Sequence, residues 1–252
     1  NGGTAPDSYT WSIGGLYERT TTAANHTIAE TDVSQISAGT YTLTVKAIKG
    51  SCTLQTVSYN IFIIDCPYTG TDLLIDATHE CKEITTGSST YYQAYIKETG
   101  TGVGQIYRIV RLPPANSNLW WFAENSKLGT KAHEANGVYY YIQGNASGAC
   151  PAGWSVPTST QWSDMISGVG ASGSDGKVLC STTFTNGGST GTDLWGFSAT
   201  NTHYYSGSSL DSSNGAFIWA SDSNSGAEIR PDKAGSASAS TGYGYTVRCV
   251  RQ

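Results

Sequence analysis

The sequence predicts two β-rich parts, an all-β sandwich followed by an α+β domain. Three observations lead to this prediction. Apolar and polar residues alternate over 40–47 and again over 57–63, which is the period of half-buried strands. One segment, 158–168, has the capped and amphipathic pattern of a short helix. Charged residues make only 13% of the chain, where about 25% is usual, while Gly supplies 30 residues and aromatic residues 11%.

The composition excludes two classes of partner. The net charge is −5 and the densest cationic cluster is only Arg108–Arg111, whereas phosphate binding needs clustered Lys and Arg, so we expect no nucleic acid partner. The longest apolar run, near Ile61–Ile64, is far shorter than the roughly 18 residues of a spanning helix, so we expect no membrane span. The 7 Trp, 16 Tyr and 5 Phe supply enough buriable surface for two modest cores.

The cysteines indicate the compartment. Six cysteines occur without a CxxC pair or a neighbouring His, a pattern that favours disulfides over a zinc site. Disulfides persist in oxidising surroundings, so we expect a secreted or cell-surface protein, with a phage virion as the alternative. The first residues, 1–4, lack the charged start and apolar stretch of a signal peptide, and we therefore expect a mature chain or a piece cut from a longer precursor.

Residues 1–66 are predicted to form the sandwich. Tyr9–Ile13 is a short strand in which Trp11 could anchor a core, and strands over 41–47 and 57–63 form a hairpin about the turn at 49–51. The early Tyr-x-Trp strand and the late "AGTYTLTVKA…GSC" hairpin resemble bacterial Ig-like or PKD-like surface modules. This resemblance implies a spacer, truncated at its N-terminus if the chain is a cut piece.

The next segment, 67–103, is predicted to be a connector with one strand, "STYYQAYIKETG", closed by the turn at 100–104. Further along, Thr158 and Gln161 form a capping box that begins a helix, and Gly168 is predicted to be the left-handed residue that ends it. The buried face of this helix is expected to consist of Trp162, Met165 and Ile166. Trp154 and Trp219 are likewise predicted to be core residues.

A family resemblance covers residues 104–252. The motifs "YRIVRLPPANSNLWWFAENSK", "GVYYY", "CPAGWSVPTSTQW", "GFSA", "FIWASDS" and "GYTVRCVRQ" follow one another in a fixed order. This order resembles the Fibrobacter succinogenes major paralogous domain, a C-type-lectin-like module common in surface proteins of Bacteroidota. The resemblance implies a compact unit whose chain ends meet as neighbouring strands, the last running over 246–251, and a disulfide between Cys150 and Cys249.

The remaining four cysteines allow three pairings. Proximity in the sequence favours Cys52 with Cys66, which leaves Cys81 with Cys180.

Nothing in the chain favours catalysis. No G-x-S-x-G motif occurs, and the four histidines are scattered. The segment "GWSVPTSTQW" also resembles formylglycine-generating sulfatase modifiers, but their activity depends on reactive cysteines and a metal, whereas Cys249 is assigned to the structural bridge. The calcium-binding motifs of classical C-type lectins are missing, and Asp211–Gly215 and Asp222–Gly226 are typical turn sequences. We predict a non-enzymatic protein without cofactor or metal.

The predicted function is ligand binding. Between residues 200 and 245, 37 of 46 residues are Asn, Tyr, Ser, Thr, Asp, His, Ala or Gly. Such loops suit recognition, as in antibody paratopes, although flexible surface loops share this composition. The same eight types are those that adenine mutagenesis produces from Asn codons in variable proteins of diversity-generating retroelements, which use lectin-like domains of this kind. We hypothesise that this chain is such a protein.

The predicted ligand is a host or bacterial surface protein or a glycan. Tyr204 and Tyr205 are expected to be the anchors of one exposed surface, because aromatic residues carry most interface energy. A pilus or surface-layer subunit and a carbohydrate-active or modifying enzyme are the alternatives. The predicted contact residues are Thr202, His203, Tyr204, Tyr205, Ser223, Asn224, Arg230, Asp232 and Lys233.

Overall fold

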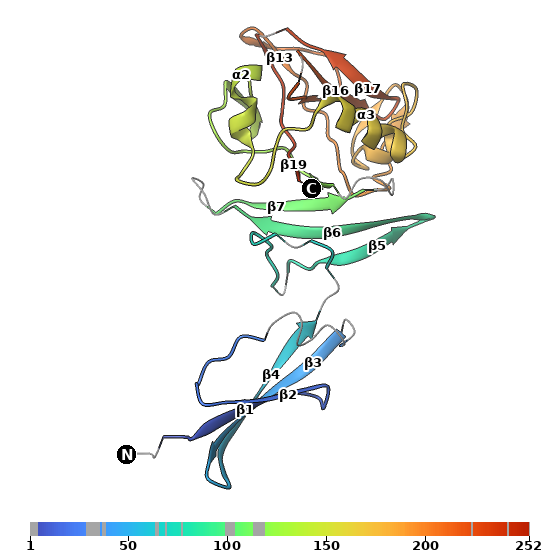
Figure 1. Cartoon of the computed structure of the whole chain (residues 1–252). Helices are drawn as coiled ribbons and strands as arrows, with labels where there is room; N and C mark the ends of the chain where they lie inside the picture. Colours follow the sequence, from blue (N-terminus) through green and yellow to red (C-terminus); the bar gives the residue numbers. More distant parts are fainter. Residues whose placement is uncertain are drawn as a thin grey trace. The chain divides into compact units, whose positions relative to one another are not determined.

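The computed structural model consists of two units, residues 1–66 and 67–252, each with its own internal packing (Figure 1). Both units are built mainly of antiparallel strands, with few and short helices. The structure describes residues 5–28, 36, 39–63, 66–68, 70–76, 78–98, 104–112, 119–222, 224–240 and 242–251.

The N-terminal unit contains one antiparallel sheet in the order β2-β1-β3-β4. The predicted strand at 9–13 is confirmed, and the predicted hairpin is confirmed with longer strands. Val45 lies opposite Val57 and Leu43 opposite Tyr59, so the apolar positions of the two strands share one face. The four strands are β1 (Ser8–Ile13), β2 (Tyr17–Thr21), β3 (Gly39–Lys49) and β4 (Cys52–Ile63).

The described part of this unit contains this single sheet, so the second layer of the predicted sandwich stays a prediction. Its buried core is small and consists of Ile13, Tyr17 and Ile36, with Trp11 packed against it and only partly buried. Tyr59 on the same sheet is 56% exposed. Alternation predicts that one face of a strand is apolar, but it does not say what covers that face.

The C-terminal unit is built around a five-stranded sheet in the order β19-β8-β7-β6-β5. Its strands are β5 (Lys82–Thr86), β6 (Ser89–Lys97), β7 (Ile106–Arg111), β8 (Trp120–Phe122) and β19 (Val250–Arg251). The segment predicted to be a connector with one strand therefore contributes two strands to this sheet. The physical reason is that β6 pairs with β7 along six positions, with Ile96 opposite Tyr107, and both of these side chains are buried.

The end of the chain differs from the predicted strand over 246–251. Only Val250–Arg251 forms β19, while Thr246 bridges to Ile218 and the Cys249 carbonyl accepts a hydrogen bond from the Phe122 N–H at 2.9 Å. Because residues 245–250 are buried on all sides, their side chains do not alternate between core and solvent. The expected pairing of the two chain ends is also wrong, since β8 lies between β19 and β7.

The predicted helix is confirmed as α3 (Ser159–Gly168). The Thr158 hydroxyl accepts the Gln161 N–H at 3.1 Å, and the Gln161 side-chain carbonyl accepts the Thr158 N–H at 2.8 Å, which completes the capping box. Gly168, however, is still helical, and the left-handed residue is Gly170 with φ +77°. Gly168 is the last helical residue, and Val169, the C-cap, extends the buried apolar face by one position before the left-handed turn.

Helix α3 packs on a second sheet, of order β15-β16-β17. The strands are β15 (Ala216–Trp219), β16 (Ser225–Arg230) and β17 (Lys233–Ser238). All three tryptophans predicted to be core residues are buried, with Trp162 2% and Trp219 0% exposed, which confirms that prediction. The Trp162 indole N–H donates to the Trp219 carbonyl at 3.1 Å, and that of Trp154 donates to Asp72 at 2.9 Å.

Short elements complete the C-terminal unit. A three-stranded sheet has the order β14-β13-β18, and β9 pairs with β10 and β11 with β12. Their bounds are β9 (His133–Ala135), β10 (Val138–Tyr140), β11 (Thr185–Asn186), β12 (Ser189–Thr190), β13 (Tyr205–Ser206), β14 (Ser209–Leu210) and β18 (Tyr243–Gly244). The helical turns are α2 (Gln143–Ala146), η1 (Ser147–Ala149) and η2 (Lys177–Leu179).

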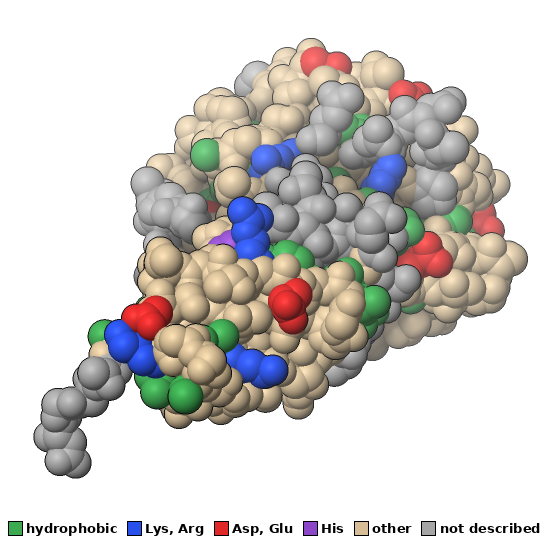
Figure 2. Space-filling model, turned by 60° about the horizontal axis from the view of Figure 1, so that its bottom comes forward, with side chains coloured by type: hydrophobic (Ala, Val, Ile, Leu, Met, Phe, Trp, Pro, Cys, Tyr) green, Lys and Arg blue, Asp and Glu red, His purple; other side chains and the backbone are tan. Residues whose placement is uncertain are grey.

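The surface reflects the low charge content of the sequence. On the face shown in Figure 2, Lys and Arg side chains are scattered among uncharged ones. Across the described ranges, every helix is too short or too polar to cross a bilayer.

Candidate functional site

The predicted contact residues separate into two groups and one isolated position. Residues 202–205 lie beside β13 and β15, whereas Arg230, Asp232 and Lys233 surround the turn between β16 and β17. Asn224 precedes the opposite end of β16 and is therefore about 20 Å from Arg230 along the strand. Ser223 lies outside the described residues. The predicted single surface is thus not formed by these residues together.

The first group includes what we name the tyrosine cluster, which consists of two ring pairs, Tyr205 with His133 and Tyr204 with Tyr243. All four side chains are half-buried. Strand β13 pairs Tyr205 with Gly244 and Ser206 with Tyr243 of β18, so Tyr204 and Tyr243 share one face of this strand pair and Tyr205 lies on the other. The Tyr204 ring centroid lies 5.1 Å from that of Tyr243 and 4.8 Å from that of Phe217. These contacts hold Tyr204 in place and leave part of its ring accessible.

Tyr205 is held by a different set of rings. It stacks on His133 with a centroid distance of 4.2 Å and an interplanar angle of 9°, and it meets Tyr140 edge-on at 4.9 Å. His133 comes from β9, more than 70 positions earlier in the sequence, so only the tertiary fold brings the two rings together. The stacking fixes both rings, and both side chains remain partly exposed.

The other two residues of this group have structural roles. Thr202 is only 3% exposed, and its carbonyl accepts a hydrogen bond from the Tyr140 hydroxyl. His203 has a positive φ of +56°, and its Nδ1 lies 2.9 Å from the Ser213 carbonyl oxygen. The prediction that Thr202 is a contact residue is therefore wrong, because a buried side chain has no surface to offer to a ligand.

Asp211 supplies the charge beside the tyrosine cluster. Its carboxylate accepts the Ser213 N–H at 2.7 Å, which is the predicted turn geometry, and hydrogen bonds from Ser213 lower the pKa of Asp211. The pKa of Tyr204 is raised by burial first and then by the nearby charge of Asp211. At neutral pH the cluster consequently presents a neutral phenol beside an ionised carboxylate, which together can donate and accept hydrogen bonds.

The second group neutralises itself. Arg230 lies 3.3 Å from both Glu228 and Asp232, and the Lys233 ammonium lies 2.5 Å from Glu228. Asp232 also accepts a hydrogen bond from the Asn186 amide at 3.0 Å. Because these charges are already paired with one another, they add little to recognition unless a ligand displaces a partner.

Sequence reasoning missed two members of the tyrosine cluster, His133 and Tyr243. Tyr243 lies in the Ser- and Gly-rich segment that suggested recognition, so its composition carried a signal. His133 lies in a region without such a composition, and its place in the cluster depends on the pairing of β9 with β10. No pattern in the sequence indicates that contact.

A buried arginine positions a neighbouring loop. The Arg248 guanidinium donates to the carbonyls of Phe197 and Ser198 and to the Asn125 side chain, the last two at 3.1 and 3.0 Å. Burial lowers its pKa, with a smaller contribution from Arg108. Arg108 in turn donates to the Ser198 hydroxyl at 2.7 Å. These donors hold the loop around Ser198, which itself has a positive φ of +54°.

The cysteines agree with the predictions in one pair only. The Cys150–Cys249 disulfide is confirmed, and Cys66 and Cys81 are also disulfide-bonded. Cys52 and Cys180 are free thiols, so both preferred pairings are wrong. Cys52 begins the 12-residue strand β4 and Cys66 follows its end, which separates them by about 40 Å, whereas a disulfide needs Cα atoms within about 7 Å.

The described residues include one buried free thiol, Cys180, and no group of metal-ligating side chains. Burial raises the pKa of the Cys180 thiol to about 12, so the thiolate that catalysis requires is not populated at neutral pH. No three His, Cys, Asp or Glu side chains of the described ranges lie close enough to hold a metal ion. Asp222 accepts the Ser159 N–H and hydroxyl, both at 2.8 Å, at the start of α3.

Comparison with known proteins identifies the family. No curated protein and no solved structure matches the chain. The Fibrobacter succinogenes major domain matches residues 89–251, which begins at β6, earlier than the boundary at residue 104 that the sequence motifs suggested. The difference follows the fold, because β6 is a full partner of β7 in the central sheet. The chain therefore belongs to the Fibrobacter succinogenes major domain family.

Proposed function

We propose that this chain is a non-enzymatic surface protein that binds a protein or glycan ligand through the tyrosine cluster of its C-terminal unit. In this proposal the C-terminal unit is C-type-lectin-like and the N-terminal unit is an Ig-like spacer. The two disulfide-bonded cysteine pairs support export, since such bonds persist in oxidising compartments.

The observation that carries the proposal is that the tyrosine cluster is both held and partly exposed. Tyr204 packs among Phe217, Tyr243 and Tyr245, and Tyr205 stacks on His133. Rings that are already held by packing lose little conformational freedom on binding, which increases affinity. Tyrosines also combine a flat apolar face with a hydroxyl, and they dominate recognition surfaces for that reason.

The test is an array of glycans and bacterial and host surface proteins, probed with the whole chain. For any ligand bound, we expect Tyr204→Ala combined with Tyr205→Ala to weaken binding about 30-fold or more, the effect of losing a hot spot worth about 2 kcal/mol. Tyr59→Ala is the matched control, because Tyr59 is an exposed tyrosine in the other unit. Unchanged affinity in the double variant would exclude the tyrosine cluster as the binding site.

Two other results would favour the alternative functions. An assembly in which copies of the chain bury the tyrosine cluster against one another would indicate a pilus or surface-layer subunit. Turnover of an arrayed glycan would indicate a carbohydrate-active enzyme and would contradict the proposal.

We propose further that the loops between residues 200 and 245 are diversified by a retroelement. Sequencing many copies of the gene from one population should then show substitutions confined to positions of the adenine-derived types, such as Tyr204 and Tyr205. The buried Phe217, Ile218 and Trp219 should stay constant, because they form the core strand β15. Substitutions spread evenly over the chain would contradict retroelement diversification.

A further inference from the structure

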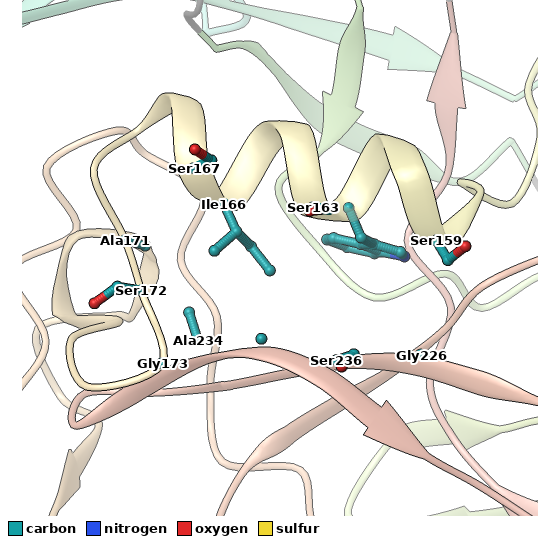
Figure 3. Close-up of a pocket in the computed structure, with 12 residues that line it drawn as sticks. Ser159, Ser163, Ile166, Ser167, Ala171, Ser172, Gly173, Gly226, Ala234 and Ser236 are labelled. Carbon is teal, nitrogen blue, oxygen red and sulfur yellow. The ribbon is translucent and has the colours of Figure 1, made fainter.

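A groove runs along α3, between this helix and β17 (Figure 3). It has a volume of about 300 Å³, which is at the lower end of the range for ligand sites. Ser159, Ser163 and Ser167 lie on its helical side, at a spacing of four residues, and Ala234 and Ser236 lie on its strand side. All the described residues that line it are uncharged. An uncharged group can therefore bind in the groove without leaving a charged side chain buried and unpaired.

The strand side of the groove is an open sheet edge. Strand β17 is the last strand of its sheet and pairs only with β16. The Ala234 N–H donates to the Ser172 carbonyl at 2.7 Å, away from β16, so the backbone groups of Ser236, two residues on, point to the same open side. Among the described residues, none forms a hydrogen bond with the backbone N–H or C=O of Ser236.

Beyond Lys233, its first residue, this edge lacks the usual protection against strand pairing. Natural edge strands are commonly shielded by charged residues, proline or bulges. Strand β5, which is an edge strand of the five-stranded sheet, is an example, because it carries Lys82 and Glu83. In β17 the one charged residue is Lys233, at its first position and paired with Glu228, whereas residues 234–240 read "AGSASAS", without a charge or a proline, and the register of β17 with β16 is regular.

We propose that the groove between α3 and β17 binds an extended, uncharged segment of a partner protein, which adds to β17 as an antiparallel strand. Its backbone would exchange two hydrogen bonds with Ser236, accept one from the Ser238 N–H and donate one to the Ala234 carbonyl. Every second side chain of the segment would enter the groove beside the serine row of α3. The small groove and its neutral lining select small, uncharged side chains at those positions.

This site is distinct from the tyrosine cluster. Cross-strand pairing places Ile218, Ala227 and Ser236 on the face of the sheet toward α3. Phe217 and Trp219 point to the opposite face, where their rings contact Tyr245. Failure of one site therefore leaves the other proposal standing.

The test begins with the edge itself, in the whole chain. We expect the Ser236 amide to exchange with deuterium much faster than that of Ala237, whose N–H points toward β16. A library of random decapeptides is then displayed and selected on the chain. We expect enriched sequences to be uncharged and extended, and to slow exchange of the Ser236 amide when bound.

Three variants locate the binding. Ser236→Pro removes the outward N–H without removing a hydrogen bond to β16, and an edge strand tolerates proline at such a position. We expect it to weaken peptide binding at least tenfold, and Ser163→Leu to do the same by filling the groove. Ser236→Ala, the matched control, keeps the N–H and should bind like the parent chain.

Several results would overturn the proposal. They are strong protection of the Ser236 amide in the free chain, selection that enriches no peptide, and peptide binding that survives both Ser236→Pro and Ser163→Leu. Another such result is self-association of the chain, with no peptide enriched, that is lost in Ser236→Pro. This result would show that the edge binds a second copy of the chain. Because Ser163→Leu alters a different element, a folding defect in Ser236→Pro does not leave the question open.

Discussion

Replacing both Cys150 and Cys249 by alanine is expected to lower the free energy of unfolding of the C-terminal unit by about 4 to 5 kcal/mol. The bond joins residues 99 positions apart, so it restricts the unfolded chain strongly. It also ties Cys150 to the segment that enters β19, whose Cys249 is fully buried. Denaturant unfolding followed by tryptophan fluorescence measures the change, because six of the seven tryptophans lie in this unit.

Cys52→Ser is the matched control and should leave the unfolding transition unchanged, since Cys52 is an exposed free thiol. Thiol labelling provides a second measurement. The native, unreduced chain should label at Cys52 only, and the unfolded, unreduced chain at Cys52 and Cys180. Stoichiometric labelling of Cys249 without reduction would show that the disulfide is absent. It would also remove one argument for an oxidising compartment.

Trp162→Ala is expected to cost about 3 to 5 kcal/mol of the free energy of unfolding, the usual range for truncating a buried tryptophan. Its ring lies 4.9 Å from that of Trp121 and 6.1 Å from that of Phe197, which joins α3 to the central sheet. The substitution also leaves the buried Trp219 carbonyl without its indole donor. Thermal and denaturant unfolding of the whole chain measure the loss.

Two further variants separate packing from helix propensity. Asp164→Ala changes an exposed position of the same helix and should shift the free energy of unfolding by no more than about 0.5 kcal/mol. Trp162→Phe keeps an aromatic ring but removes the N–H, and should fall between the parent and Trp162→Ala. A melting temperature unaltered by Trp162→Ala would show that α3 does not dock through this side chain.

The features predicted correctly from the sequence depend on neighbours in the chain. The capping box of Thr158 and Gln161 acts within one turn, and the buried stripe of α3 repeats with the helical period. The hairpin of β3 and β4 likewise follows from alternation about a tight turn. The Cys150–Cys249 bond was implied by an ordered set of motifs rather than by any local rule.

Features that the tertiary structure alone decided involve residues far apart in the sequence. The left-handed residue after α3 is Gly170, which follows the buried Val169, and burial depends on what packs there. Strand β4 is long enough to keep Cys52 and Cys66 far apart. The disulfide predicted from their proximity in the sequence is therefore not formed.

The candidate site shows the same division. Composition alone led to the prediction that Tyr204 and Tyr205 are recognition residues, which stays a prediction, whereas by itself the sequence determined the family and the helix. Stacking of His133 on Tyr205, burial of Thr202 and the open edge at Ser236 were decided by the tertiary structure. The physical reason is that local patterns report which side chains prefer burial, whereas contacts and free edges depend on which strands pair across the whole unit.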